Sequence, residues 1–131
     1  AALAAETGAT LIRHDTYYAR VIHPETVVSH AHLAQVRQIV IGDIRDALGR
    51  GEDVVYDGVN LNAAHRSELA SVGAETGADV VCVFMDTPLD VCLARDHVGW
   101  ARIFADGAQY PTTDEGFELI ICHDGYEEDA T

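Results

Sequence analysis

The chain has 131 residues, of which 48% are apolar, so it can form one folded domain and is not a disordered segment. It carries 22 acidic residues against 8 basic ones, a net charge of −14, and every basic residue is an arginine. Because binding along a polyanion depends mainly on basic residues, this balance argues against a broad nucleic-acid surface, although a local group of arginines can still hold one phosphate.

Helix and strand patterns alternate from the start of the chain. Residues 1–6 are strong helix formers, and residues 9–14 predict a short strand that ends at Asp15. We expect a long helix to follow, with Pro24 at its first helical position and an apolar stripe spaced by three and four residues. The stripe consists of Leu33, Val36, Val40, Ile44, Ala47 and Leu48.

Three further strands are predicted in the rest of the chain. Residues 52–57 form one, and Asn62 is placed to cap the helix that follows it. Residues 78–86 are apolar throughout their centre, which is typical of a strand buried on both faces. A short helix comes next, and residues 117–122 predict the last strand.

The alternation of strands with helices predicts a parallel α/β sheet covered by helices on both faces. In such sheets ligands bind beyond the carboxyl ends of the strands. Three predicted strands end there in an aspartate, namely Asp15, Asp57 and Asp86. The peptide AETGA occurs twice, at residues 5–9 and 74–78, and we interpret it as one helix-to-strand turn used twice.

Several chemistries lack their sequence signals. The three cysteines (Cys82, Cys92 and Cys122) include no C-x-x-C pair, which argues against a disulfide framework and favours a reducing cytoplasm. No apolar run approaches the ~18 residues of a membrane helix. The histidines show no standard zinc spacing, and neither the G-x-S-x-G elbow nor the G-x-G-x-x-G fingerprint occurs.

Residues 54–66, VVYDGVNLNAAHR, place an aspartate after an apolar strand, the general form of a Walker B element. The run D-G-V-N followed by Arg66 resembles the D-x-T-N…R segment of P-loop kinases of the polynucleotide-kinase-like and zeta-toxin-like type, with Val59 in place of threonine. The resemblance implies that Asp57 lies beside Mg²⁺ and that Asn60 and Arg66 hold nucleotide or phosphate. The alternative from the residues alone is that Asp57 and Asn60 shape a turn and cap a helix.

Residues 11–18, LIRHDTYY, resemble the segment after the second strand of the same family. Asp15 matches the aspartate that accepts the proton of the attacking hydroxyl, so the resemblance implies that it is the general base. Tyr18 stands where the family often has arginine, which disfavours an acceptor with a phosphate nearby. The tyrosines can stack on a base or sugar, and a purely structural role is an equal alternative.

Residues 80–96, VVCVFMDTPLDVCLARD, resemble the strand and helix that lead into the lid of these kinases. The resemblance implies that Arg95, and at a longer spacing Arg102, neutralise charge on the ATP phosphates during transfer. A solvated cation at the helix end is the alternative for Arg95. Residues 110–121 resemble the closing strand segment, where we interpret Glu115 as a turn or cap residue.

The largest departure from the family concerns the P-loop. The motif G-x-x-x-x-G-K-[ST], whose backbone and lysine cradle phosphates, does not occur, and the chain contains no lysine. The resemblance begins just after that loop. We therefore expect a single P-loop-kinase-like domain over residues 1–131, incomplete at its N-terminus. Its fold would be three-layered α/β/α and P-loop NTPase-like, without the first strand and the P-loop.

Together these resemblances imply an ATP-dependent phosphotransferase that uses ATP and Mg²⁺. The acidic charge favours a small-molecule hydroxyl over a nucleic-acid end as the acceptor. Its catalytic residues would be Asp15, Arg95 and Arg102. The alternative is a catalytically inactive kinase-like domain that serves as a binding module. A P-loop motif encoded before Ala1 would favour the enzyme, and a natural start at Ala1 would favour the module. We expect a cytoplasmic protein without membrane contact.

Overall fold

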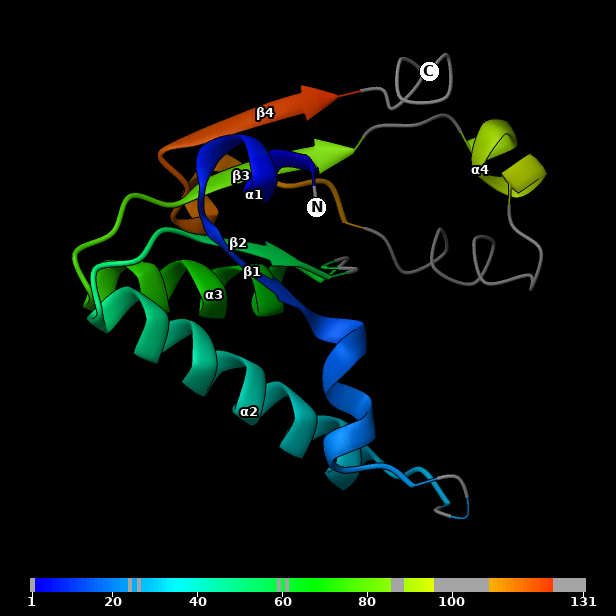
Figure 1. Cartoon of the computed structure of the whole chain (residues 1–131). Coiled ribbons are helices and arrows are strands. Elements are labelled where there is room, and N and C mark those ends of the chain that lie inside the picture. Colours follow the sequence, from blue (N-terminus) through cyan, green and yellow to red (C-terminus); the bar gives the residue numbers. More distant parts are fainter. Residues whose placement is uncertain are drawn as a thin grey trace. The chain divides into compact units, whose positions relative to one another are not determined.

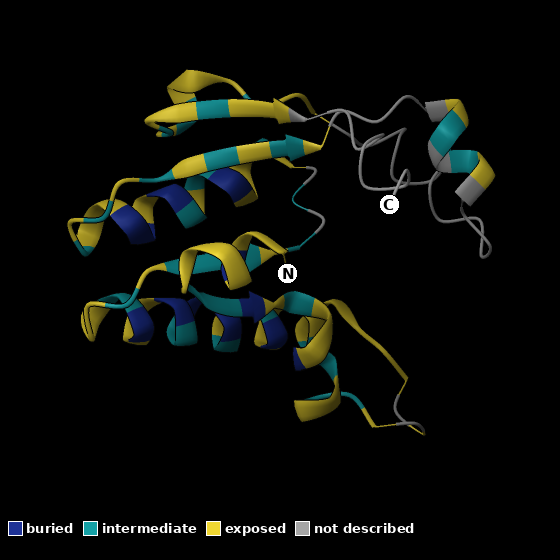
Figure 2. Ribbon diagram, turned by 45° about the horizontal axis from the view of Figure 1, so that its top comes forward, coloured by how far each residue is buried: buried dark blue, intermediate teal, exposed yellow. Residues whose placement is uncertain are grey.

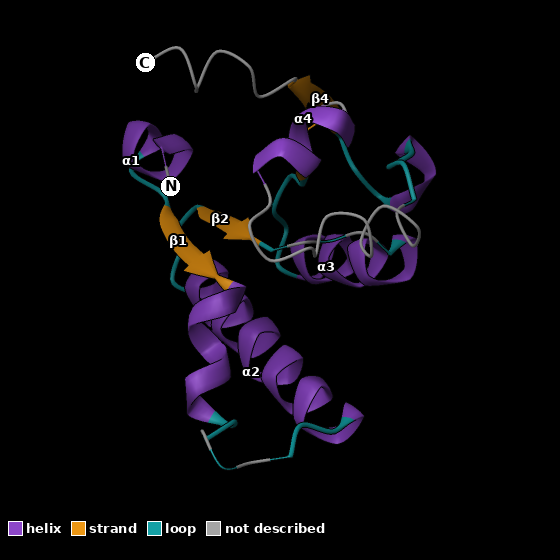
Figure 3. Cartoon of the chain, turned by 90° about the vertical axis from the view of Figure 1, so that its right-hand side faces the viewer, coloured by secondary structure: helices purple, strands orange, loops and turns teal. Residues whose placement is uncertain are grey.

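The computed structural model describes residues 2–23, 25, 27–58, 60, 62–85, 89–95 and 109–123, in which helices alternate with strands (Figures 1 and 3). The predicted mixed α/β character is thereby confirmed. None of the described helices is both long and apolar enough to cross a bilayer. In chain order the elements are α1 (Ala2–Thr7), β1 (Thr10–Arg13), the 3₁₀ helix η1 (His14–Arg20), α2 (His30–Gly49), β2 (Val54–Asp57), α3 (Ala63–Glu75), β3 (Val81–Met85), α4 (Leu89–Arg95), the 3₁₀ helix η2 (Thr113–Glu115) and β4 (Leu119–His123).

Two compact units make up the chain. The first comprises Ala1–Val59 with Glu75–Ala78, and the second comprises Asn60–Ala74 with Asp79–Thr131. In the first unit β1 pairs with β2, and in the second β3 pairs with β4. Both pairs are parallel, as the alternation of helices and strands predicts.

The core of the first unit is built on one face of α2, which packs against β1, β2 and η1. Figure 2 shows this face as a buried stripe along the helix. The predicted stripe is confirmed at Val36, Val40, Ile44 and Ala47, but Leu33 is 42% exposed. The buried apolar residues of this unit are Ala4, Ile12, Tyr17, Val36, Val40, Ile41, Ile44 and Ala47.

The start of α2 differs from the prediction. The helix begins at His30 rather than at Pro24, because Ser29 is its N-cap. The Ser29 hydroxyl accepts a hydrogen bond from the backbone N–H of His32, and His32 Nδ1 accepts one from the backbone N–H of Ser29 at 3.1 Å. These reciprocal bonds form a capping box, with a histidine in the position that usually holds glutamate or glutamine.

The two AETGA peptides adopt the same turn, as predicted. Gly8 follows α1 with φ +73°, and Gly77 follows α3 with φ +76°. Both glycines therefore lie in the left-handed region, which closes a helix C-terminus at little cost only for a residue without a Cβ. Each turn leads directly towards the next strand, β1 or β3.

The expectation that residues 78–86 form a strand buried on both faces is wrong for the described part of the chain. Exposed and partly buried residues alternate along β3, and Val81, Val83 and Met85 are 48%, 43% and 48% exposed. A continuous apolar run shows that both faces of a strand are suited to burial. It does not show whether another element packs against the second face.

Replacing Gly77 with alanine should lower the free energy of unfolding by about 1–2 kcal/mol. A Cβ at this position would meet no atom within 4 Å, so the cost comes from the left-handed backbone alone. The matched control is Gly42→Ala in the middle of α2, where a Cβ also meets open space and alanine should stabilise by about 0.5–1 kcal/mol. Urea denaturation measures both, and equal effects would contradict the prediction.

Candidate functional site

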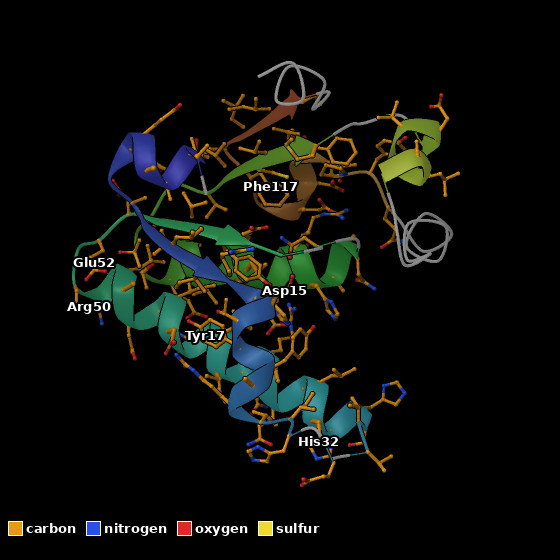
Figure 4. All side chains as sticks on the ribbon, turned by 45° about the vertical axis from the view of Figure 1, so that its right-hand side comes forward. Asp15, Tyr17, His32, Arg50, Glu52 and Phe117 are labelled. Atoms are coloured by element: carbon orange, nitrogen blue, oxygen red, sulfur yellow. The ribbon has the colours of Figure 1, made fainter. Side chains whose placement is uncertain are left out.

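The carboxyl ends of β1 and β2 carry two of the predicted aspartates. Arg13 and Asp57 are register partners at the last position of both strands, and Asp15 follows β1 within η1. Figure 4 labels Asp15 just beyond the end of β1. Asp15 is exposed, the Asp57 side chain is 54% exposed, and Arg13 Nε lies 3.8 Å from Asp57 Oδ2. Parallel pairing thus places both carboxylates at one edge of the strand pair, open to solvent.

Three aromatic rings lie at the same edge, and we call them the ring cluster: His14, Tyr18 and Tyr56. The His14 Nδ1 and the Tyr56 hydroxyl form a hydrogen bond of 2.6 Å. The His14 ring meets the Tyr18 ring edge to face at a centroid distance of 5.4 Å, and the Tyr56 ring at 6.0 Å. Sequence reasoning did not identify Tyr56, and its place directly before Asp57 is the one signal that could have suggested it.

Gly58 makes the position of Tyr56 possible. A Cβ at residue 58 would lie 2.6 Å from the Tyr56 hydroxyl oxygen and 2.9 Å from the ring carbon that carries it. A Cβ at that distance would force the Tyr56 ring to shift, so the glycine of the D-G-V-N run leaves room for the ring that precedes Asp57. The requirement is steric, because the backbone of Gly58 is not in the left-handed region.

The surroundings of the ring cluster keep its rings uncharged at neutral pH. Burial lowers the pKa of His14 below its usual value of 6.5, and Arg37 lowers it further against the opposing effect of Asp15. Burial raises the pKa of Tyr56 to about 12; Tyr18, Asp57 and Asp15 add to that rise, and Arg37 opposes it. Burial and then Asp15 also raise the pKa of Tyr18. Asp15 therefore acts electrostatically on all three rings.

In the second unit, Arg66 and Glu115 form a buried ion pair. Arg66 Nη2 donates to Glu115 Oε1 at 2.8 Å, and Arg66 Nε donates to Oε2 at 3.2 Å. The two side chains are only 6% and 7% exposed. The backbone N–H of Thr112 also donates to Glu115 Oε2, at 3.0 Å. Glu115 is thus the turn and cap residue that the sequence predicts, and it is the partner of Arg66 as well.

The same arginine holds the segment that follows the Walker B-like strand. Arg66 Nη1 donates to the backbone carbonyl of Asn60 at 2.8 Å, and Asn60 has a left-handed φ of 51°. Asn62 caps α3 as predicted, because its Oδ1 accepts from the backbone N–H of Ala64 at 2.8 Å. In this structure all three nitrogens of the Arg66 guanidinium donate hydrogen bonds to protein groups, namely the Glu115 carboxylate and the Asn60 carbonyl. A contact of Arg66 with a phosphate stays a prediction.

The remaining predicted residues lie partly outside the described chain. Arg95 is the last residue of α4, and the structure describes its backbone but not its side chain. Val59, Asp86 and Arg102 lie outside the described residues. Within the described residues, no three His, Cys, Asp or Glu side chains gather as a metal site. Nucleotide-bound Mg²⁺ takes one or two carboxylates together with phosphate oxygens and water, a requirement that the half-exposed carboxylate of Asp57 fits.

A separate cavity of about 280 Å³ lies in the first unit, between β1 and α2, and Tyr17 and Arg50 on its lining are labelled in Figure 4. Its polar groups bind one another. The Tyr17 hydroxyl donates to Asp43 at 2.7 Å, Arg20 Nη1 donates to the same carboxylate at 3.2 Å, and Arg50 pairs with Glu52 at 2.6 Å. None of the predicted catalytic residues lines this cavity, and we assign it a structural role.

Comparison with known families supports the sequence resemblance. Residues 1–102 match the AAA_33 family, described as an AAA domain. The chain belongs to this family of AAA domains. Its members are P-loop NTPases, often with kinase activity, so membership implies nucleotide binding and agrees with the parallel strands of both units. A comparison with curated proteins finds no match.

Replacing Gly58 with alanine should push the Tyr56 ring aside and break its hydrogen bond with His14. Because burial is the main cause of the lowered pKa of His14, the loss of the packed ring should raise that pKa towards 6.5. An NMR titration of the histidine side chains measures the shift. Gly42→Ala, which meets open space, should leave the pKa of His14 unchanged. An unaltered His14 titration in the Gly58 variant would show that the ring contact does not depend on the glycine.

Replacing Glu115 with glutamine should lower the free energy of unfolding by about 3–5 kcal/mol, because it leaves the buried Arg66 guanidinium without its counter-charge. The exposed Glu118→Gln in the same unit is the control, with a change below about 0.5 kcal/mol.

The Glu115→Gln variant also tests how the free energy of unfolding depends on pH. The bonds from Arg66 lower the pKa of Glu115 below its ordinary value of 4.5. Its stabilising contribution is therefore complete above pH 4.5 and is lost as the pH falls towards the folded pKa. The original chain should lose stability more steeply than the glutamine variant below pH 4.5, and parallel pH profiles would contradict this.

Proposed function

We propose that this AAA domain is the body of an ATP-dependent phosphotransferase, which moves the γ-phosphate of ATP to a hydroxyl of a small molecule. One observation carries the proposal: Asp15 and Asp57 stand at the carboxyl ends of adjacent parallel strands, where α/β sheets bind their ligands. Family membership supports the nucleotide as the second substrate.

The proposed reaction needs little covalent chemistry from the protein. The acceptor oxygen attacks the γ-phosphorus, and a bond forms between them. The bond from the γ-phosphorus to the bridging oxygen breaks, and ADP leaves with that electron pair. Asp15 accepts the proton of the acceptor hydroxyl. Its carboxylate is exposed, so an acceptor can reach it, and transfer then depends on positioning and charge neutralisation.

Asp57 would hold Mg²⁺ together with the nucleotide phosphates. The ion supplies neutralisation of phosphate charge when it is bound. The contact of Asp57 with Arg13, at 3.8 Å and half exposed, is loose enough to yield to a stronger ligand. Asn60 would contact the nucleotide or substrate from a segment that Arg66 and Glu115 hold in place.

Further parts of the proposal concern the residues that contact the phosphates, the class of acceptor and the location in the cell. Arg95 and Arg102 would neutralise the transferring phosphate, as the resemblance to kinase lids implies. The 131 residues do not contain the P-loop motif that cradles nucleotide phosphates. The net charge of −14 favours a small molecule over a nucleic-acid end as acceptor. A cytoplasmic location is proposed from the absence of cysteine pairing motifs.

Asp15→Asn should reduce kcat by roughly 10²- to 10⁴-fold, because the acceptor proton loses its base, while the affinity for MgATP stays unchanged. Asp57→Asn should instead raise the Mg²⁺ concentration needed for half-maximal rate. Radiolabelled γ-phosphate transfer by the natural polypeptide that contains these residues measures both. Asp53→Asn, an exposed aspartate just before β2, is the control and should change neither quantity.

The opposite result has a clear meaning. If the natural polypeptide neither binds MgATP nor transfers phosphate, the chain is a kinase-like binding module and not an enzyme. If it transfers phosphate but Asp15→Asn is as active as the unaltered protein, the base has been assigned to the wrong residue.

A further inference from the structure

The ring cluster lies beside the proposed base and contributes little to the core. The fully buried side chains of the first unit come from the aliphatic face of α2, whereas His14, Tyr18 and Tyr56 are each only partly buried. His14 and Tyr18 lie on either side of Asp15 in η1, four positions apart, and Tyr56 meets His14 from β2. A group of partly exposed rings at a ligand-binding edge needs an explanation beyond packing.

From this arrangement we propose that the ring cluster is the wall against which the acceptor binds, and that the acceptor carries its hydroxyl on or beside a ring. The inference rests on the proposed phosphotransferase function and names the class of its acceptor substrate. Rings bind flat molecules and the C–H faces of sugars through their apolar surfaces, whereas a linear polyol offers no such face.

The hydrogen bond between His14 and Tyr56 prepares this wall before any ligand arrives. It joins two residues that are 42 positions apart, and Gly58 leaves the space that the Tyr56 hydroxyl needs. A ring held in place by such a bond loses little conformational freedom when a ligand stacks on it. Tyr18 completes the cluster through its edge-to-face contact with His14, so its ring is the one that a substitution can remove without breaking the hydrogen bond.

The charges around the ring cluster narrow the acceptor class further. Asp15 and Arg37 act on the rings electrostatically, Asp57 acts on Tyr56, and Arg13 pairs with Asp57. Two cations, Arg13 and Arg37, thus stand against two anions, Asp15 and Asp57. This balance favours an uncharged ring compound over an anionic or a cationic one.

Binding of three uncharged probes to the natural polypeptide that contains these residues tests the proposal, with and without saturating MgADP. Uridine offers a planar base and a sugar ring, methyl riboside offers a sugar ring alone, and ribitol is the linear counterpart. We expect at least one ring compound to bind roughly 10-fold more tightly than ribitol. Binding of uridine alone would identify a planar ring as the recognised group, and binding of both would identify the sugar ring.

Tyr18→Leu is the decisive variant. It should weaken binding of the ring compounds by roughly 10-fold and leave ribitol unaffected, and Tyr18→Phe should restore the affinity. Tyr110→Leu, which removes an exposed tyrosine of the second unit, is the matched control and should have no effect. A purely structural tyrosine would weaken all three probes alike or none of them.

The outcomes separate this inference from the proposed function. Equal affinity for ribitol and the ring compounds, or an equal effect of Tyr18→Leu on all probes, overturns the ring-binding wall even if phosphate transfer is observed. If the natural polypeptide neither binds MgATP nor transfers phosphate, the proposed phosphotransferase function is overturned. In that case the acceptor assignment falls with it, whatever the ring compounds do.

Discussion

Parallel pairing of β1 with β2 is the constraint on which the candidate site depends. Because both strands run in the same direction and end in register at Arg13 and Asp57, whatever follows each strand emerges at the same edge. The buried aliphatic face of α2 holds the pair together from one side. Asp15, Asp57 and the ring cluster are neighbours for this reason, although β1 and β2 are separated in sequence by a 3₁₀ helix and the 20 residues of α2.

The second unit uses a different device, a buried and bidentate ion pair. A guanidinium and a carboxylate with side chains 6% and 7% exposed must satisfy each other, since either one left alone would be an uncompensated buried charge. Arg66 and Glu115 do so with good geometry, and the third donor group of Arg66 fixes the carbonyl of Asn60. The pair therefore ties three separate segments together: α3, the chain after β2, and η2.

This arrangement changes the meaning of a motif residue. Family resemblance places Arg66 among residues that hold nucleotide or phosphate, but in the structure its side chain holds the protein's own backbone. A residue of this kind can matter for function by positioning Asn60 rather than by touching a ligand. Membership of the AAA family implies that the domain binds a nucleotide, whereas the ring cluster carries the proposal for the acceptor.

Local patterns in the sequence determined the α/β alternation, the buried centre of α2, the two left-handed glycine turns and the Asn62 cap, because each depends on residues a few positions apart. Only the tertiary structure decided that His14 meets Tyr56, 42 residues away, and that Arg66 meets Glu115, 49 residues away. Such pairs leave no periodic signal, since their partners are brought together by tertiary packing and not by helical or strand spacing. The exposed face of β3 could not be predicted for the same reason. An apolar run shows that a strand can be buried, but whether another element covers it depends on the tertiary structure.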